Sequence, residues 1–281
     1  MIRITADSTC DLPQALLDQY HIAISPLGVV KGDALFRDGV DITTQAIVAH
    51  VENGGEITTT NAVNIADYYL FFQEEIKGYD GLVHINLGAG FSSCYQNACL
   101  AASEFENVVA LDSENLSIGH GIVVLTAARV AAQGGSIEEI TAAVKQVRSK
   151  VETSFVLETL DYMKKGGRCS TVTALGANLL KLHPCIEVVD GKMTVTKKYR
   201  GSMEKVMVTY VEERLSGRED IDPTSVYLAD SCHNPDHSIV AAAHKALVDN
   251  GTFEQIIPTA IGCTILCHCG PNTLGFVFVR K

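Results

Sequence analysis

The chain has 281 residues, of which 47% are hydrophobic and 20% charged, and its formal net charge is −11. That length allows one large domain or two of ordinary size, and the composition is typical of a soluble globular protein. An acidic surface repels phosphate backbones, so a nucleic-acid partner is disfavoured. The nine cysteines are sparse and odd in number, so we expect small buried hydrophobic residues rather than a disulfide framework.

No apolar run approaches the roughly 18–20 residues that span a bilayer. The opening "MIRITADSTCDLP" lacks the basic and apolar regions of a signal peptide. We therefore expect a cytoplasmic protein with at most transient membrane contact. Basic residues gather in two stretches of this acidic chain, namely Lys164, Lys165 and Arg168, and then Lys192, Lys197, Lys198 and Arg200.

The first half of the chain alternates predicted strands and helices. Strand-like patterns occupy residues 2–7, 22–30, 81–87 and 107–113, and helical spacing occupies 12–20, 43–53, 66–79, 92–105 and 117–135. Ser136 and Glu139 form a capping-box pattern that begins one more helix. Such alternation predicts a parallel sheet with helices on its faces. We expect residues 1–152 to form this Rossmann-like α/β domain.

The pattern changes near residue 150. Asp190 and Gly191 lie between two strand-like runs within residues 184–200, which is a hairpin signal. Further strands are predicted at 224–230, 253–259 and 273–281, separated by helices at 203–215 and 236–251. A mixed or antiparallel sheet with helices fits this order. Residues 153–281 are therefore expected to form a second α/β domain.

Polar residues appear at four predicted strand ends, where open α/β sheets bind their ligands. The most informative end is "NLGAGFSSCYQNA", in which Gly88 and Gly90 precede Ser92, Ser93 and a helix. Glycines allow close backbone approach, and the first N–H groups of a helix attract anions. A simple helix cap would explain the serines equally well. The other three ends are Asp7–Thr9, Thr58–Asn61 and Asp112–Ser117.

Standard nucleotide motifs are missing from the sequence. It contains neither a GxxxxGK[ST] loop nor a GxGxxG fingerprint, so nucleotide binding through a standard phosphate loop has no support.

Six short motifs occur in order along the chain: "ADSTCDLP", "PLGV", "FRDGVDIT", "GFSSCYQNA", "LDYMKKGGR" and "HCGPNTLG". Together they resemble the DegV family of bacterial proteins over essentially the whole chain. The resemblance implies a two-domain α/β protein that holds one long-chain fatty acid, with the acyl tail in a buried tunnel and the carboxylate near the domain interface. It implies a binding subunit that presents the carboxylate to a separate ATP-dependent fatty-acid kinase for phospholipid synthesis, without cofactor or chemistry of its own.

The resemblance also implies a set of carboxylate contacts. In "TTNA", Thr59 takes the place of the family's donor threonine, with Thr60 beside it. In "GFSSCYQ", Ser92 matches the carboxylate-binding serine and the Ser93 N–H the donor at the helix start. In "HCGPN", His268 matches the carboxylate-side histidine. The chain departs from the family motifs at Asn61, Ala62, Ser93, Cys94, Cys269 and Asn272.

Elementary electrostatics supports such a site, because a buried carboxylate must be hydrogen-bonded or it protonates. Two hydroxyls, one backbone N–H and one imidazole can satisfy it without a Lys or Arg. Apolar stretches at 175–182, 206–211 and 239–247 could line the tail or be ordinary core. In the family, the "KKGGR" loop and the segment around Arg200 lie near the mouth, which makes Arg168 and Arg200 candidates for kinase docking.

The stretch "CTILCHCGPN" (Cys263–Asn272) raises the alternative of a metal or redox site. Its cysteine spacing fits no usual zinc pattern. In an extended segment, Cys267 and Cys269 would share one face and leave His268 on the other. We therefore expect no metal, buried thiols, and a ligand-binding role for His268. Other candidate ligands that fit no recognised site are Cys169, Cys232, His233 and His237.

Two further functions stay open. A serine-dependent hydrolase or acyltransferase would use Ser92 and His268 with an aspartate such as Asp7 or Asp112, although no GxSxG elbow surrounds Ser92. Fold similarity also suggests a dihydroxyacetone-kinase-like protein, although the chain has no evident carboxylate cluster for ATP and Mg²⁺.

Overall fold

The structure, a computed structural model, describes residues 1–173, 182–231 and 237–281. The first part of the chain forms, in order, β1 (Ile2–Asp7), the 3-10 helix η1 (Ser8–Cys10), α1 (Gln14–Gln19), β2 (Ala23–Ser25), β3 (Gly28–Lys31), β4 (Ala34–Arg37), α2 (Thr44–Glu52), β5 (Thr59–Asn61), α3 (Ile65–Glu75), β6 (Gly81–Asn86), α4 (Cys94–Ala102), β7 (Val108–Asp112), α5 (Ser117–Ala132) and α6 (Ile137–Arg148). The second part forms β8 (Val151–Val156), α7 (Asp161–Gly166), α8 (Ser170–Thr173), β9 (Leu182–Val189), β10 (Lys192–Arg200), α9 (Met203–Leu215), β11 (Val226–Asp230), α10 (Ser238–Asn250), β12 (Ile256–Ala260), α11 (Cys263–Cys269) and β13 (Leu274–Val279).

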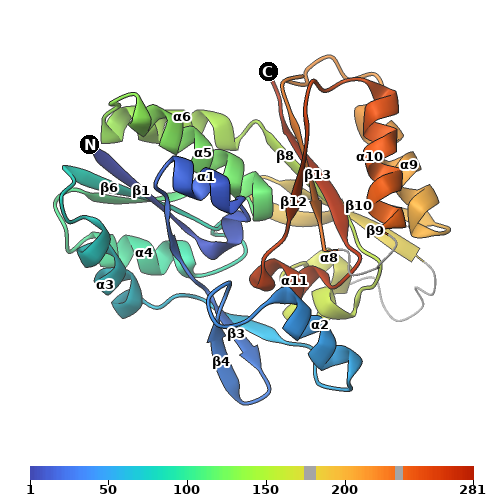
Figure 1. Cartoon of the computed structure of the whole chain (residues 1–281), viewed down its shortest axis with the longest axis horizontal. Helices are drawn as coiled ribbons and strands as arrows, with labels where there is room; N and C mark the ends of the chain where they lie inside the picture. Colours follow the sequence, from blue (N-terminus) through green and yellow to red (C-terminus); the bar gives the residue numbers. More distant parts are fainter. Residues whose placement is uncertain (174–181, 232–236) are drawn as a thin grey trace.

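A four-stranded parallel sheet organises the N-terminal part, as predicted. Its strand order is β2-β1-β6-β7, with α5 and α6 on one face and α3 and α4 on the other (Figure 1). Helices on both faces bury all six residues of the central strand β6, as expected for a parallel sheet. The capping box of Ser136 and Glu139 is present and begins α6.

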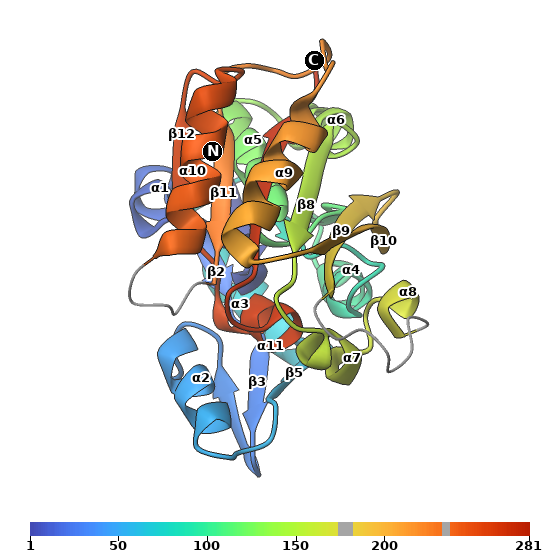
Figure 2. The same cartoon turned by 90° about the vertical axis from the view of Figure 1, so that its right-hand side faces the viewer.

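A six-stranded mixed sheet organises the C-terminal part, again as predicted. Its order is β10-β9-β8-β13-β11-β12, in which only the β11–β12 pair is parallel. Asp190 and Gly191 form the predicted hairpin, and both have positive φ (48° and 68°), as a type I′ turn requires. The expected boundary between residues 152 and 153 falls inside β8. Helices α9 and α10 cover one face of this sheet (Figure 2).

A third, antiparallel sheet with the order β4-β3-β5 was not predicted. The expected single strand at 22–30 is wrong, because β2 belongs to the parallel sheet and β3 to this small one. Pro26 lies between them, and proline cannot donate to a strand ladder. Residues 59–61 thus form a strand of the small sheet, which packs with α2 against α11 (Figure 2).

Helix α5 lies between the two larger sheets. Eleven of its sixteen residues are buried. Its apolar side chains join one core cluster with residues of β1 and β6 on one side and with Tyr227, Ala229 and Val277 of the C-terminal sheet on the other. A helix that packs on two opposite sides needs apolar residues on both, which explains the run "GIVVLTAARVAA", in which Arg129 is exposed.

Within the described ranges, no helix is both long enough and apolar enough to cross a membrane.

Candidate ligand-binding site

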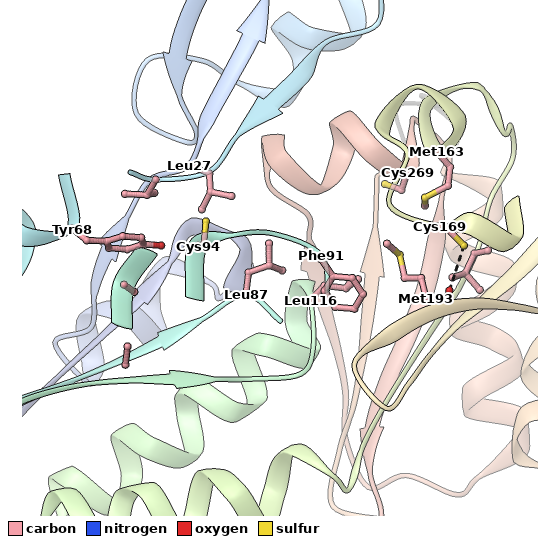
Figure 3. Packing of buried hydrophobic residues seen from close by; sticks show 14 of the residues in the cluster. Leu27, Tyr68, Leu87, Phe91, Cys94, Leu116, Met163, Cys169, Met193 and Cys269 are labelled. Carbon is pink, nitrogen blue, oxygen red and sulfur yellow. Dashed lines mark hydrogen bonds between the residues drawn. The ribbon is translucent and has the colours of Figure 1, made fainter. Parts of the chain in front are cut away.

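Strands of the small and the C-terminal sheets and the loop that follows β6 of the parallel sheet meet around an apolar cavity of about 60 Å³. Figure 3 shows its surroundings: Leu27, Leu87 and Cys94 lie on one side, Met163, Met193 and Cys269 on the other, and Phe91 and Leu116 between them. The wall is mostly hydrophobic, with a few polar side chains. It consists of Leu27, Thr60, Ala62, Leu87, Phe91, Ser92, Leu116, Phe155, Met163, Arg168, Met193, Thr264, Ile265, His268 and Cys269.

A second cavity of about 40 Å³ adjoins the first. The two share Leu116, Phe155, Ile265 and Cys269 as walls. The second continues between α5 and the C-terminal sheet, where Ala229 and other sheet residues line it. The pair therefore marks an apolar path that runs from a polar end into the core.

Thr60 and His268 meet at the polar end. The Thr60 hydroxyl and His268 Nε2 are 2.8 Å apart and hydrogen-bonded. Side chains alternate along a strand, so Thr60 of β5 faces α11 together with Thr58, whose hydroxyl contacts Cys267 Sγ at 3.0 Å. Thr59 points the other way and does not line the cavity. Of the two threonines assigned to the carboxylate, the structure places Thr60, and not Thr59, on the cavity wall.

The His268 side chain is half-buried, and its imidazole is neutral near pH 7. Burial, and then the positive charge of Arg168, lower its pKa to about 4. A Cβ on residue 166 would lie only 2.2 Å from His268 Nδ1, so Gly166 of α7 permits the close approach of the ring. Nδ1 has no hydrogen-bond partner among the described residues. A neutral imidazole with an unpartnered nitrogen can still accept or donate one bond.

Ser92 lines the same cavity as His268. Its hydroxyl accepts a hydrogen bond from the Cys94 N–H and donates one to Cys94 Sγ, both at 3.2 Å. Burial, and then the charge of Asp7, raise the pKa of the Cys94 thiol to about 11, so it stays protonated. Ser93 is exposed, precedes α4 as its cap residue and makes no side-chain capping bond. The structure thus brings Ser92, but not the Ser93 side chain, to the cavity.

The loop that carries Ser92 is anchored by two aspartates. Asp7 is fully buried and accepts hydrogen bonds from Leu87 N–H (2.8 Å) and from the side chains of Tyr68, His84 and Asn86. Burial raises the pKa of Asp7, but its bond to His84 and the neighbouring charges outweigh this, so the net shift is downward. Asp112 accepts from Ala89 N–H at 3.1 Å. These bonds hold the loop. Neither carboxylate is hydrogen-bonded to His268.

Arg168 lies closer to the ligand site than expected. It lines the cavity, and its guanidinium donates to the Gly166 carbonyl at 2.6 Å. The cavity thus has a cation at its polar end, which the sequence reasoning did not require. Arg200 ends β10, is exposed and does not line the cavity. Of the other basic residues, Lys165 pairs with Glu56 (3.7 Å) and Lys197 with Glu213 (2.5 Å).

The "CTILCHC" stretch is a helix, so the assignment of its side chains to two faces of an extended segment does not apply. In α11, Cys263 and Cys267 are four residues apart and join one hydrophobic cluster, whereas Cys269 joins another. No group of three or more possible metal ligands occurs within residues 1–173, 182–231 and 237–281. Cys232 and His233, named above as candidate ligands, lie outside the described residues.

The apolar stretches proposed for the tail have different positions. Residues 206–211 and 239–247 lie on α9 and α10 and pack on the far face of the C-terminal sheet as ordinary core. Residues 175–182 lie outside the described residues, except for Leu182. Sequence reasoning missed Phe155, Met163, Met193 and Ile265 as cavity walls. Each comes from a different element, and no local pattern distinguishes it from a core residue.

Comparisons with known proteins agree with this fold. The family described as "Uncharacterised protein, DegV family" matches residues 1–281. A DegV domain-containing protein of Clostridium acetobutylicum is 31% identical, covering 100% of this chain and 99% of the relative. One of Clostridium perfringens is 29% identical with the same coverage. A solved DegV family protein of Thermus thermophilus, described by its fatty-acid binding, superposes with a TM-score of 0.88 at 27% identity, covering 100% and 99% of the two chains. The resemblance is confirmed, and the chain belongs to the DegV family.

Proposed function

We propose that this protein binds one long-chain fatty acid and presents its carboxylate to a separate ATP-dependent kinase subunit. The carboxylate lies at Thr60, Ser92 and His268, with the Ser93 N–H as a further donor, and the tail extends into the apolar core between α5 and the C-terminal sheet. The fatty-acid binding of the Thermus thermophilus relative supports the ligand class.

The hydrogen bond between Thr60 and His268 carries the proposal. It places a hydroxyl and a half-buried imidazole side by side at the polar end of an apolar cavity, with Ser92 in the same wall. An incoming carboxylate can accept from both hydroxyls and from His268 Nε2–H if it takes the place of the bond between Thr60 and His268, and Arg168 adds favourable charge. The hydrophobic wall matches an acyl tail and offers little to a polar substrate.

A long ligand requires the walls to move apart. The cavities measure about 60 and 40 Å³, whereas pockets for ligands of this size hold at least roughly 300 Å³. Leu116, Phe155 and Ile265 separate the two cavities, so we expect these side chains to move when a tail passes.

The alternative of a serine hydrolase is less well supported. A triad needs a carboxylate that orients the imidazole and an imidazole that accepts the serine proton. His268 Nδ1 faces Gly166, and Asp7 and Asp112 bind other partners. With a pKa of about 4, His268 is a weak general base at neutral pH.

Mass spectrometry of lipids extracted from the purified protein tests the ligand class. We expect a single class of long-chain fatty acid at about one equivalent, and no turnover of a p-nitrophenyl acyl ester. Rapid ester hydrolysis that is lost in Ser92→Ala would replace the carrier by the hydrolase.

The proposed kinase role rests on the basic residues Arg168, which lines the cavity, and Arg200, which is exposed at the end of β10. Arg200 is exposed and outside the cavity, so it can meet a partner without touching the ligand. We expect Arg200→Glu to slow acyl-phosphate formation with the cognate kinase at unchanged fatty-acid affinity, more strongly at low salt. Lys145→Glu, on the exposed face of α6, is the matched control. Equal losses of kinase rate and affinity in Arg200→Glu would assign that residue to the ligand site or the fold.

A further inference from the structure

Helix α11 is the part of the ligand site that most needs external support. It carries His268 in its last turn and contributes Thr264 and Ile265 to the cavity wall. With seven residues it is too short to be stable alone. Its cap residue, Gly262, has no side chain that could satisfy the first N–H groups.

Two aspartates from the beginning of the chain satisfy these groups instead. Asp38 accepts from the N–H of Cys263 (3.0 Å) and of Thr264 (3.2 Å), one with each carboxylate oxygen. Asp11 accepts from the N–H of Gly262 at 2.9 Å. Both carboxylates are buried, with 4% and 8% of their residue surface exposed. The contacts join positions more than two hundred residues apart in sequence.

The aspartates are themselves fixed by hydroxyls. Ser8 donates to Asp38 at 2.9 Å, and Ser117, at the start of α5, donates to Asp11 at 2.5 Å. Gly262 is needed at this point, because a Cβ there would lie 2.9 Å from an Asp11 oxygen. The first turn of α11 is thus tied to η1, to the segment after β4 and to α5 together.

We propose that Asp11 and Asp38 are positioning residues of the ligand site, which hold α11 so that His268 meets Thr60 and the incoming carboxylate. We call these two residues the clamp. This inference rests on the proposed function and deepens it. Neither aspartate lines the cavity, so each acts on the ligand through the helix.

The electrostatics of the clamp agree with this role. Asp11 faces Asp38 and the thiols of Cys10 and Cys269, and Asp38 faces the thiols of Cys263 and Cys267. Burial, with the Asp38 charge adding to it, raises the pKa of Asp11 to about 8. Near neutral pH the clamp therefore keeps a proton on Asp11 and avoids two adjacent buried charges.

Histidine titration by NMR tests the clamp without a ligand. Among the described residues, two histidines have a pKa lowered to about 4, the half-buried His268 at the end of α11 and the buried His120 in α5. If Asp38 positions α11, Asp38→Ala frees the helix, and the pKa of His268 rises toward 6.5 while that of His120 stays near 4. An unchanged pKa of His268, or an equal rise in the pKa of both histidines, would overturn the proposal. The charge that bears on His268 is that of Arg168, which all variants keep.

Affinity for a fluorescent long-chain fatty acid provides the second measurement. We expect about a tenfold loss in Asp38→Ala, as for removal of a strong helix cap. Asp38→Asn keeps one acceptor oxygen, so it should lose less affinity than Asp38→Ala. It replaces the alanine variant in this measurement if that variant does not fold. Asp222→Ala is the control, because it removes a carboxylate that caps Thr224 N–H (3.0 Å) far from α11. Full affinity in folded Asp38→Ala would overturn the inference, whereas a wild-type protein that binds no fatty acid would overturn the proposed function and leave the titration result intact.

Discussion

Replacing Thr60 by valine removes one hydroxyl and almost nothing else. Threonine and valine are both β-branched and of similar shape, so the strand conformation of β5 is retained. His268 Nε2 loses its partner at 2.8 Å, and the ring nitrogen Nδ1 is already unpartnered among the described residues. Leaving a buried polar group unsatisfied costs about 1–3 kcal/mol. The free energy of unfolding should fall by that amount.

The same change should weaken fatty-acid binding. The carboxylate loses one of its hydrogen-bond donors. Since about 1.4 kcal/mol corresponds to each tenfold loss of affinity, we expect the Kd to rise roughly tenfold to a hundredfold. Displacement of a fluorescent fatty acid measures Kd, and urea denaturation measures stability. Thr59→Val is the matched control, since Thr59 is the adjacent half-buried residue that points away from the cavity. A loss of fatty-acid affinity in Thr59→Val with none in Thr60→Val would refute our assignment of the carboxylate-binding hydroxyl to Thr60.

Three other predictions concern the site and its surroundings. Ser92→Ala should weaken fatty-acid binding about tenfold to a hundredfold in a titration, while Ser93→Ala, outside the cavity, should preserve it. Because burial raises the pKa of Asp11 to about 8, the folded state holds this proton more tightly, and its stabilising contribution is lost as pH rises from about 4 to about 8. Asp11→Asn should therefore gain stability relative to wild type between pH 5 and 8 in urea denaturation, and a constant difference would contradict this. Elemental analysis should find no stoichiometric zinc or iron, because α11 directs its thiols into two separate clusters; one tightly held equivalent would contradict that reasoning.

The two larger sheets were predictable because their strands and helices have clear periodicity. Parallel strands such as β6 are short apolar runs between helices, and the Asp190–Gly191 turn has a specific sequence signal. The small sheet was not predictable in the same way. Its strands have three or four residues, and Pro26 interrupts what otherwise reads as a single strand.

The candidate site was predictable in its residue types and less so in its geometry. Motifs pointed to Ser92 and His268, which both line the cavity, but choosing between Thr59 and Thr60 requires the strand register, since one step reverses the face. Helix α11 has apolar residues at Cys263, Leu266 and Cys267, a helical spacing too short to distinguish from a strand. Its caps come from far along the chain, which no local pattern reveals.

The position of α5 has a consequence for how the molecule unfolds and opens. Because one helix supplies core to both large sheets, drawing the sheets apart would expose to water the apolar face of α5 that packs on the C-terminal sheet. Both halves should therefore unfold together in a single cooperative transition, and neither should be soluble when cleaved from the other near residue 150. A hinge between the sheets is thus a costly route for a ligand. A route of lower free energy passes the short elements α7, α11 and β5 at the polar end of the cavity. Their small size limits the apolar surface that each uncovers when it shifts.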